Sequence, residues 1–373
     1  MRIAVDGVRL SRKPSGVTFI VISIIKQLAI QCPSWNIYVL LRAEIHPLLK
    51  GVLVEDNIKF IISRPSLLNS KSLFWSLFQL NRMINNLNPD YFIAPNTLLY
   101  PFFANKKVKK IIFVHDLVFK TWPATMSFLN KIQLIILFKY SIKKAAIIWC
   151  NSNYTKRELL NYYHSQTDTK PIFVGAGLNI DFKLALAKYN TTNAAAVKNS
   201  VKPYIIFVGT IEPRKNIPFL LTVFKKLSNQ FDLIILGGKG WGNAENKISS
   251  ILNAEDYPKN NVRVISNIDT DHLIALYKNA ALYLTTSFNE GLGLPLLEAM
   301  ACGCPVVCSH NSAMIEVVQG VGITVNSWDV NDWLNAISEV KSNREYYVDR
   351  GYKRVDNFNW EKVITSFVKL LNS

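Results

Sequence analysis

The residues that point most clearly to chemistry lie in the segment FNEGLGLPLLEAMACGCPVV, which runs from Phe288 to Val307. It holds two carboxylates, Glu290 and Glu298, separated by a Gly-x-Gly-x-Pro turn that opens a helix. Pro295 suits a first helical position, because its ring presets φ and its missing N–H would lack a helical partner anyway. Free N–H groups at the positive end of a helix dipole favour phosphate, and a carboxylate about one turn further can accept hydrogen bonds from vicinal hydroxyls. The segment therefore suggests a nucleotide-sugar site.

Each glutamate taken alone is more often a solvated surface residue than a ligand-binding one. The combination is more specific, and EGLGLPLLEAMACGCPVV resembles the signature of retaining glycosyltransferases of family 4, which have the GT-B fold. The resemblance implies that Glu290 contacts the hydroxyls of the donor sugar and that Glu298 contacts the ribose. It also implies that the backbone amides of the turn face the sugar and the diphosphate. The turn residues carried over are Gly291, Leu292, Gly293 and Leu294.

The bulk composition is that of a globular protein with large cores. The chain has 373 residues, enough for two domains, and combines 49% hydrophobic with 18% charged residues. Its N-terminus lacks the apolar core of a signal peptide, and no apolar run approaches the ~18 residues needed to span a bilayer. Five cysteines, three of them crowded into the signature segment, predict buried free thiols in a reducing cytoplasm rather than a metal cluster.

The positive charge is confined to the first half of the chain. Residues 1–200 contain 26 lysines and arginines against 9 acidic residues, whereas residues 201–373 contain 17 of each. Basic and aromatic side chains interleave there, as in Lys71–Phe78 and from Lys120 to Lys144. Nucleic acid or an anionic membrane would attract such a surface, and bulky apolar groups beside lysines fit the membrane interface better. A merely solubilising basic surface is the simpler alternative.

Short apolar runs alternate with longer helical patterns, which is the βαβ rhythm of parallel, doubly wound sheets. The pattern predicts helices over Val17–Gln31 and Phe128–Lys144. Predicted strands of the first half are Ile3–Val5, Ile37–Leu41, Ile111–Val114, Ala146–Cys150 and Pro171–Val174. Predicted strands of the second half are Tyr204–Gly209, Asp232–Leu236, Val262–Ser266, Ala281–Thr285, Val306–Cys308 and Gly322–Val325.

The expected fold class is therefore α/β, with two Rossmann-like doubly wound domains facing a central cleft, and the family resemblance implies that this is the GT-B fold. Residues 1–200 form an acceptor-binding domain and residues 201–373 a donor-binding domain. The small, polar stretch at about 189–202 reads as the linker between them. The tail at about 357–371 is amphipathic, and the family resemblance suggests that it crosses back onto the first domain.

A basic pair follows the first strand of the second half. Gly209 ends this strand, and the chain continues Thr-Ile-Glu-Pro-Arg-Lys, so that Arg214 and Lys215 can bring cations to a diphosphate leaving group. Family members carry a glycine, often followed by arginine, and then a lysine some six residues after the glycine. Gly209 and Lys215 match this pattern, but Thr210 stands where the arginine is expected. The sequence leaves open whether Arg214 replaces it.

The first domain offers three weaker candidates. Gly16 lies in a loop between the first strand and a helix, where the family places a glycine near the diphosphate and the acceptor; it equally suits a plain helix start. His115 ends a strand at its carboxyl edge, and a histidine at this place in related enzymes contacts the transferred sugar. Arg9 is a further candidate for the acceptor or the phosphate.

Asp269-Thr-Asp271 invites a metal-site interpretation, because Asp-x-Asp holds a divalent cation in the other large glycosyltransferase fold. It directly precedes a helical pattern, so we predict an N-cap instead. Ser266, at the end of the strand before it, occupies the place where the family holds the edge of the nucleobase. We expect no metal and no other cofactor.

The family resemblance implies a retaining, metal-independent hexosyltransferase, and we expect it to act in bacterial surface-polysaccharide (O-antigen or capsule) synthesis. The variant GT-x-EPRKN is similar to a subgroup rich in mannosyltransferases and favours GDP-mannose as donor. The expected acceptor is a glycan or a polyprenyl-linked sugar. The expected location is the cytoplasm, peripheral on the inner face of the plasma membrane, without nucleic acid. Alternatives are a sugar-nucleotide epimerase, a phosphorylase of the same fold, which lacks a supporting motif, and a basic membrane- or nucleic-acid-binding scaffold.

Overall fold

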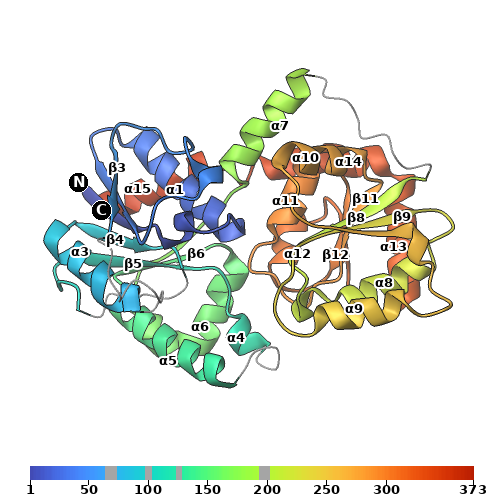
Figure 1. The fold of residues 1–373 in the computed structure, drawn as a ribbon, viewed down its shortest axis with the longest axis horizontal. Helices are drawn as coiled ribbons and strands as arrows, with labels where there is room; N and C mark the ends of the chain where they lie inside the picture. Colours follow the sequence, from blue (N-terminus) through green and yellow to red (C-terminus); the bar gives the residue numbers. More distant parts are fainter. Residues whose placement is uncertain (64–73, 97–102, 123–127, 193–201) are drawn as a thin grey trace. The chain divides into compact units, whose positions relative to one another are not determined.

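The computed structural model describes residues 1–63, 74–96, 103–122, 128–192 and 202–373 (Figure 1). The described residues divide into two compact units. Unit 1 takes its residues from Met1–Thr121, Ser127–Ile180 and Asn359–Ser373. Unit 2 takes Trp122 and the described residues of Asp181–Phe358. Each unit has its own parallel sheet, so we describe them separately.

Unit 1 contains a seven-stranded sheet in the order β3-β2-β1-β4-β5-β6-β7, with every pairing parallel. Most of its strands are short apolar runs buried on both faces, as expected when helices cover the two sides of a parallel sheet. The strands are β1 (Arg2–Asp6), β2 (Asn36–Leu41), β3 (Ile58–Ile62), β4 (Tyr91–Ala94), β5 (Lys109–Val114), β6 (Ile147–Cys150) and β7 (Ile172–Val174).

The helices of unit 1 flank this sheet, with α1 and α15 on one side and α5 and α6 on the other (Figure 1). The α-helices are α1 (Gly16–Gln31), α3 (Leu80–Leu87), α4 (Val118–Thr121), α5 (Phe128–Lys144), α6 (Asn153–Thr167) and α15 (Trp360–Asn372). Shorter helical turns are the 3-10 helices η1 (Val8–Ser11) and η2 (Pro47–Leu49) and the π-helix η4 (Trp75–Gln79).

The C-terminal helix α15 belongs to unit 1 although the rest of the second half of the chain forms unit 2. Its buried side chains recur at helical spacing, at Trp360, Ile364, Phe367 and Leu371. Phe367 packs against Trp149 of β6 with ring centroids 4.2 Å apart. The amphipathic tail therefore completes the core of the first unit.

Unit 2 contains a six-stranded parallel sheet in the order β10-β9-β8-β11-β12-β13. The chain starts in the middle of this sheet, moves outward to one edge and then returns to β11 on the other side of β8. The strand order thus reverses between β8 and β11, and ligands of doubly wound sheets bind beside such a point. The strands are β8 (Tyr204–Val208), β9 (Asp232–Leu236), β10 (Val262–Ile265), β11 (Leu282–Thr285), β12 (Val306–Ser309) and β13 (Ile323–Val325).

Helices and a buried apolar cluster hold this second sheet together. Leu220, Phe224 and Trp333 reach that cluster from α8 and α13, and all three are fully buried. The helices of unit 2 are α7 (Ile180–Thr192), α8 (Ile217–Lys225), α9 (Ala244–Leu252), α10 (Thr270–Asn279), α11 (Leu294–Ala301), α12 (Ser312–Val318), α13 (Val330–Ser342) and α14 (Arg344–Val355). Two 3-10 turns, η6 (Pro213–Lys215) and η7 (Lys259–Asn261), precede α8 and β10.

The predicted linker and domain boundary need correction. Residues 189–192 are the last turn of α7, not a linker, and residues 193–201 lie outside the described residues. The division falls at Ile180 rather than at residue 200, because α7 packs on unit 2. Phe182 of α7, for example, meets the ring of Tyr277 edge-on at 6.5 Å. Among the described residues, no helix combines the length and the apolar character needed to cross a bilayer.

Candidate active site

The predicted donor-site residues of unit 2 converge at the carboxyl ends of β8, β11 and β12, which are neighbours in the sheet. The chain after β8 passes Gly209 and turns through η6, which places Arg214 and Lys215 beside the end of β11. Gly209 has φ of 155°, and a Cβ there would lie 3.3 Å from Cε of Lys215. A glycine at this strand end therefore lets the lysine side chain lie against the backbone.

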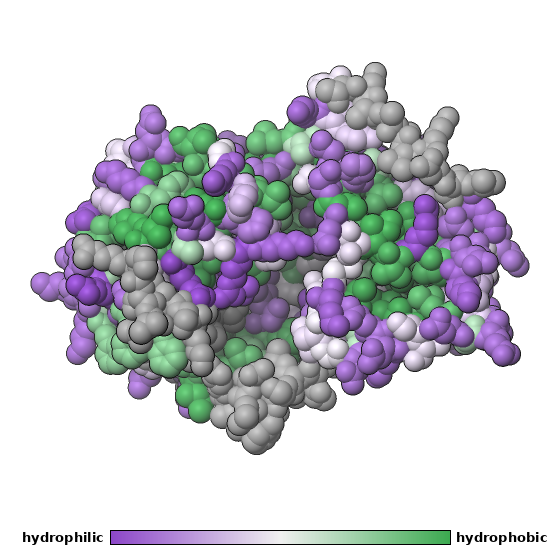
Figure 2. All heavy atoms as spheres, in the orientation of Figure 1, coloured by the Kyte–Doolittle hydropathy of each residue, from purple (hydrophilic) through white to green (hydrophobic). Residues whose placement is uncertain are grey.

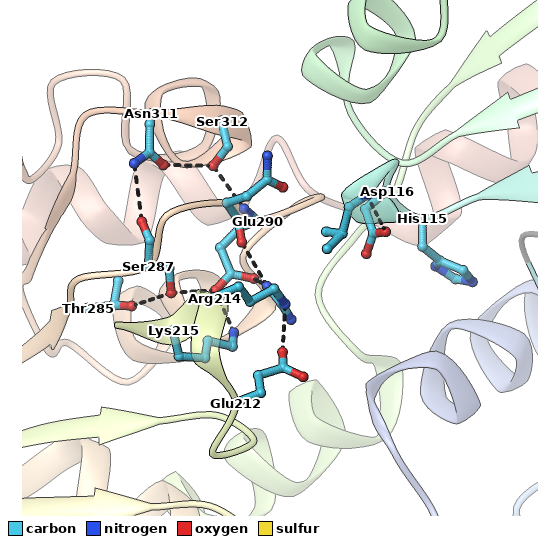
Figure 3. A network of polar contacts seen from close by, with 12 residues as sticks. His115, Asp116, Glu212, Arg214, Lys215, Thr285, Ser287, Glu290, Asn311 and Ser312 are labelled. Atoms are coloured by element: carbon cyan, nitrogen blue, oxygen red, sulfur yellow. Dashed lines mark hydrogen bonds and ion pairs between the residues drawn. The ribbon is translucent and has the colours of Figure 1, made fainter. Parts of the chain in front are cut away.

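Glu290 is the centre of the cluster (Figure 3). Lys215 donates from Nζ to Oε1 of Glu290 at 2.5 Å, and Arg214 donates from Nη1 to Oε2 at 2.7 Å. Both Lys215 and Glu290 are buried, with 6% and 8% of their surface exposed. Buried ion pairs are costly unless their remaining hydrogen-bond positions are also filled, so the contacts of the carboxylate with its other neighbours matter.

Hydroxyl groups fill those positions. Ser287 donates to Oε1 of Glu290 at 2.8 Å and is itself within 3.0 Å of Thr285 (Figure 3). The backbone N–H of Glu290 donates to Oγ of Ser312, which hydrogen-bonds to Asn311. Asn311 in turn donates to the carbonyl of Ser287. Two loops from adjacent strand ends thus fix both the backbone and the carboxylate of Glu290.

The sequence analysis missed these supporting hydroxyls. Ser287 lies just past β11 and Ser312 just past β12, so the rule that ligands meet the carboxyl ends of parallel strands would have selected both. Ser312 also has φ of 52°. A non-glycine residue whose backbone lies in the left-handed region costs free energy, and such residues are typical of functional sites. The sequence does not reveal this backbone conformation.

The charges of the cluster set its protonation. Burial raises the pKa of Glu290, but Arg214 and Lys215 outweigh burial and bring that pKa down to about 2. Burial and the neighbouring Arg214 lower the pKa of Lys215, while Glu290 opposes both. Glu290 is therefore an ionised carboxylate at neutral pH, and its oxygens accept hydrogen bonds.

Arg214 is less available for a diphosphate than the sequence suggested. Its Nε contacts Oε1 of Glu212 at 2.6 Å, and its Nη1 donates to Glu290 and to the carbonyl of Asn289. Arg214 and Lys215 carry two positive charges, and Glu212 and Glu290 carry two negative ones, so the cluster is formally neutral. An incoming diphosphate would have to compete with carboxylates for both cations.

The turn after Glu290 leads into α11 as predicted from the sequence. Gly291, Leu292 and Gly293 are buried, and Leu294 is the first residue of the helix, followed by Pro295. Gly293 caps the helix with φ of 90°, where a Cβ would meet Leu296 at 3.0 Å. Glycine is thus required at this cap, and the positive end of the helix dipole follows it directly.

Glu298 lies in the second turn of α11 and differs from Glu290 in its surroundings. Its Oε2 accepts a hydrogen bond from the hydroxyl of Tyr277 at 3.2 Å. Burial raises the pKa of Glu298 to about 7, although the Tyr277 hydroxyl acts in the opposite direction. The two acids of the signature therefore have very different proton affinities.

A second polar cluster lies in unit 1, at the carboxyl ends of β1 and β4. Asp6 is buried and accepts from the N–H of Val8 at 2.9 Å and from the side-chain amide of Asn96 at 3.3 Å. Arg9 donates from Nε to Oδ1 of Asn96 at 2.9 Å. Burial raises the pKa of Asp6 to about 6. Sequence reasoning found Arg9 but missed Asp6 and Asn96, which orient it.

His115 adjoins this cluster, after β5. Its Nε2 lies 2.6 Å from the carbonyl of Pro95, and because a carbonyl only accepts, Nε2 carries the proton. Burial lowers the pKa of His115, which keeps the ring neutral and leaves Nδ1 as an acceptor. The carbonyl of His115 accepts from the amide of Asn151, which follows β6. Four neighbouring strand ends of unit 1 thus carry hydrogen-bonding side chains.

The sequence and the fold both match known proteins. Residues 190–354 match the family described as "Glycosyl transferases group 1". The chain is 34% identical over 173 residues to "O-antigen chain mannosyltransferase B" of Escherichia coli, a match that spans 44% of each protein. It is 26% identical to "O-antigen chain mannosyltransferase RfbU" of Salmonella typhimurium, over 67% of this chain and 69% of the relative. The chain is therefore similar to the group 1 glycosyltransferases over residues 190–354, which is less than half of its length and lies within unit 2.

The structure of the chain is also similar to solved structures. Sucrose-phosphate synthase from Thermosynechococcus elongatus superposes with a TM-score of 0.75 at 19% identity, covering 100% of this chain and 98% of that one. The two Rossmann-like domains and the GT-B fold predicted from the sequence are therefore confirmed.

The remaining predicted site residues are scattered over the two units. Gly16 is the first residue of α1, so it starts a helix, and no direct contact with a ligand follows from that. Thr210 and Ser266 are both exposed beyond the ends of β8 and β10. Asp269 is the N-cap of α10 and accepts from the N–H of His272 at 2.8 Å, which confirms the predicted cap. Within the described ranges, no three His, Cys, Asp or Glu side chains gather as metal ligands would.

Proposed function

We propose that this protein is a retaining hexosyltransferase of the group 1 glycosyltransferases. It transfers a hexose, with mannose from GDP-mannose favoured, to a glycan or polyprenyl-linked acceptor in bacterial surface-polysaccharide synthesis. The observation that carries the proposal is the ionised Glu290, held between Arg214 and Lys215 at the point where the strand order of unit 2 reverses. The printed names of the two mannosyltransferase relatives support the donor sugar and the O-antigen context.

The donor occupies the carboxyl edge of the sheet of unit 2 in this proposal. The diphosphate lies at the start of α11, where the helix dipole compensates for the formal neutrality of the Glu212, Glu290, Arg214 and Lys215 cluster. Glu290 accepts hydrogen bonds from the sugar hydroxyls, since its carboxylate is ionised. Glu298 accepts from the ribose diol, for which its carboxyl group has to lose its proton.

Lys215 and Arg214 assist the departure of the nucleoside diphosphate. Negative charge develops on the leaving phosphate as the bond to the anomeric carbon breaks, and fixed cations stabilise that charge. The acceptor hydroxyl attacks from the same face, and the departing phosphate takes its proton, so the anomeric configuration is retained. No step in this mechanism uses a divalent metal or another cofactor. Of the three catalytic side chains of unit 2, Lys215 is the most deeply enclosed.

Unit 1 contributes acceptors and donors of hydrogen bonds for the sugars. His115 offers the lone pair of Nδ1 to a hydroxyl, because its Nε2 proton already bonds to Pro95. Arg9 is held through Asn96 and Asp6 and presents its guanidinium to the acceptor or to a phosphate. Gly16 and Ser266 stay candidates for contacts with the acceptor and the nucleobase. The proposed place of action is the inner face of the plasma membrane.

Ligand-induced stabilisation tests the proposal, since a ligand that binds the folded protein raises the free energy of unfolding, and at equal concentration a tighter ligand raises it more. Thermal unfolding is measured with GDP, UDP, ADP and their sugars, followed by turnover with the best donor and a lipid-linked acceptor. We expect GDP and GDP-mannose to give the largest shifts, with transfer persisting in EDTA. Lys215→Ala should abolish transfer, whereas Lys259→Ala on the exposed turn before β10 should not. No shift with any nucleotide would favour the scaffold alternative, and conversion of the donor sugar without an acceptor would favour an epimerase.

A further inference from the structure

Unit 1 exposes a cluster of aromatic and aliphatic side chains away from its polar strand ends. Leu77, Phe78, Phe103 and Tyr140 line a groove of about 490 Å³. Phe103 is 69% exposed and Phe78 is 48% exposed, values that are high for phenylalanine. Pale green hydrophobic surface gathers there over α3 and α5, with purple hydrophilic groups beside it (Figure 2). Contiguous exposed apolar groups of this kind mark interaction sites rather than ordinary surface.

The fold holds these exposed groups in place. The backbone N–H of Phe103 donates to Oδ1 of Asn81 at 2.9 Å, and its carbonyl accepts from the amide of Asn85 at 3.2 Å. Asn81 is itself buried and donates to the carbonyl of Leu77 in η4. Two asparagines of α3 therefore clamp the segment that presents Phe103. An aromatic side chain that projects into solvent from an ordered backbone is already positioned to enter a partner.

Helix α5 adds cations to one side of the groove. Tyr140 and Ile136 are four residues apart and so lie on one helix face, and Ile136 is 63% exposed. Lys143 and Lys144 follow Tyr140 by three and four residues, which places them on the same face. Nζ of Lys144 lies 5.9 Å from the centroid of the Tyr140 ring. Exposed apolar groups and ammonium groups thus alternate along this face.

The surrounding sequence is almost free of negative charge. Residues 57–150 contain 13 lysines and arginines but only 2 acidic residues, Asp90 and Asp116. Lys106 and Lys107 are exposed and follow Phe103. Asn105, just before them, donates hydrogen bonds to the side chains of Asn85 in α3 and of Asn88 at its end, which holds this segment against the helix. A partner for this region therefore has to be negatively charged and also has to accept aromatic side chains into an apolar layer.

We propose that the groove and its lysine rim bind the surface of an anionic lipid bilayer. Phe78, Phe103 and Ile136 enter the boundary between headgroups and acyl chains, and Lys143, Lys144, Lys106 and Lys107 neutralise lipid phosphates. Phosphates alone would satisfy the lysines but leave the exposed phenylalanines in water, whereas a bilayer interface satisfies both. The proposal names the surface used in the membrane association suggested above and does not depend on the transfer reaction.

Flotation of the whole chain with vesicles tests this surface. The vesicles are phosphatidylcholine alone or phosphatidylcholine mixed with phosphatidylglycerol, each at low and at high salt. One variant combines Phe78→Gln with Phe103→Gln, and a second combines Lys143→Gln with Lys144→Gln. Matched controls come from exposed residues of unit 2. Val264, which is 49% exposed, gives Val264→Gln as the control for the apolar change. Lys247 and Lys259 are exposed and give Lys247→Gln with Lys259→Gln as the control for the charge change. Thermal unfolding of each variant reports whether it is folded.

We expect the unaltered chain to float with the anionic vesicles and to be released by salt. The lysine variant should lose about tenfold or more in partition coefficient, since each lysine near an anionic surface is worth several-fold. The phenylalanine variant should bind more weakly than the unaltered chain at low salt, and its remaining binding should keep the same salt dependence, because the contribution of the phenylalanines is not electrostatic. The controls should float like the unaltered chain.

Three results would overturn the proposal: no flotation with anionic vesicles, equal losses in the unit 2 controls, or undiminished binding of both groove variants. Salt-sensitive binding to a nucleic acid that tracks the lysines but ignores the phenylalanines would also count against it. A chain that is stabilised by GDP-mannose but does not float would leave the proposed function standing and remove this surface alone. A chain that floats but binds no nucleotide would do the reverse.

Discussion

The carboxyl edges of the two sheets share a topology but carry different chemistry. At the edge of unit 2, the Glu290 carboxylate contacts two cations at 2.5 and 2.7 Å. At the edge of unit 1, the Asp6 carboxylate accepts hydrogen bonds from a backbone N–H and from the amide of Asn96. Both acids are buried, yet the pKa of Glu290 is lowered to about 2 whereas that of Asp6 is raised to about 6. The contacting cations, not burial, make the difference.

This contrast shows that the fold fixes where a site lies but not what it can bind. Both sheets begin in the middle and reverse their strand order beside the first strand, which creates an equivalent edge in each unit. The loops then decide the chemistry: η6 brings two cations to unit 2, and η1 brings Arg9 to an amide in unit 1. In the proposed function, the first edge holds the diphosphate sugar, and the second contacts sugar hydroxyls and, through Arg9, the acceptor or a phosphate.

The largest effect should come from removing the charge of Glu290. Glu290→Gln leaves Arg214 and Lys215 without their shared carboxylate, so we expect transfer to fall by about a hundredfold to a thousandfold. The free energy of unfolding should also fall, by about 3–5 kcal/mol, because a buried ion pair loses one partner. Initial rates and denaturant unfolding measure the two effects. Asp256→Asn, which breaks the exposed pair with Lys225, is the control and should change neither much.

A double variant separates catalysis from stability. Glu290→Gln combined with Lys215→Met removes one buried charge of each sign, so much of the lost stability should return while transfer stays at least as low as in Glu290→Gln. If the double variant recovered activity together with stability, Glu290 would be structural. The ion pairs at the edge of unit 2 would then stabilise the fold without taking part in transfer.

Glu298 should give the next largest effect, as a pH dependence of nucleotide binding. Its pKa is about 7 in the free protein, and hydrogen bonds from a ribose diol to the ionised form would lower that pKa in the complex. The deprotonated protein therefore binds more tightly, and the affinity for GDP should rise about tenfold from pH 6 to pH 8. Calorimetric titration measures this change. In Glu298→Gln the affinity should be lower and nearly independent of pH over that range.

The opposite slope, with affinity falling as the pH rises, would mean that the protonated Glu298 is the binding form. In that case Glu298 would donate a hydrogen bond to the ligand, and the second acid of the signature would have another role. Titrating a 2′-deoxy nucleotide in parallel distinguishes the ribose from the rest of the nucleotide, because it lacks one of the two hydroxyls.

A smaller effect is expected at the edge of unit 1. Asp6→Asn keeps the size of the side chain but weakens its hold on Asn96, and through Asn96 on Arg9. We expect KM for the acceptor to rise several-fold, roughly the value of one hydrogen bond to a charged group, while the affinity for GDP is unchanged. Steady-state kinetics with varied acceptor, and calorimetry with GDP, measure the two quantities. A change in GDP affinity equal to the change in KM would show that the two edges do not divide the substrates as proposed.

The sequence predicted the sheet of unit 2 well and that of unit 1 less well. All six predicted strands of the second half correspond to β8–β13, because each is a compact apolar run next to a turn. In the first half, β3 and β4 were missed. Strand β3 (Ile58–Ile62) lies at the sheet edge and is partly exposed, so its apolar pattern is weaker than that of a buried strand. Strand β4 (Tyr91–Ala94) has four residues, as the predicted β6 has, so its length does not explain why it was missed.

The candidate site was predictable where a residue type alone carries the chemistry. Glu290, Lys215 and Glu298 were selected from charge and spacing together with the resemblance to family 4 glycosyltransferases. Asp6 and Asn96 were not predicted. They follow β1 and β4, which are far apart in the sequence, and only the strand order of the sheet makes them neighbours. The neutralisation of Arg214 by Glu212 likewise depends on the path of η6, which no spacing rule gives.

The smallest effects should come from a pair of acids that belongs to neither edge, Asp269 and Asp271. Asp269 caps α10, so Asp269→Ala should lower the free energy of unfolding by about 1 kcal/mol. Asp271 lies in the first turn of α10, where a negative charge gains only a few tenths of a kcal/mol from the helix dipole, so Asp271→Asn should matter less. Neither variant should reduce transfer, and EDTA should have no effect on either. If both variants abolished transfer and added Mn²⁺ rescued them, Asp-x-Asp would be a metal site. A metal ion, rather than Lys215 and the start of α11, would then hold the diphosphate, and the comparison would have to include a third site besides the two sheet edges.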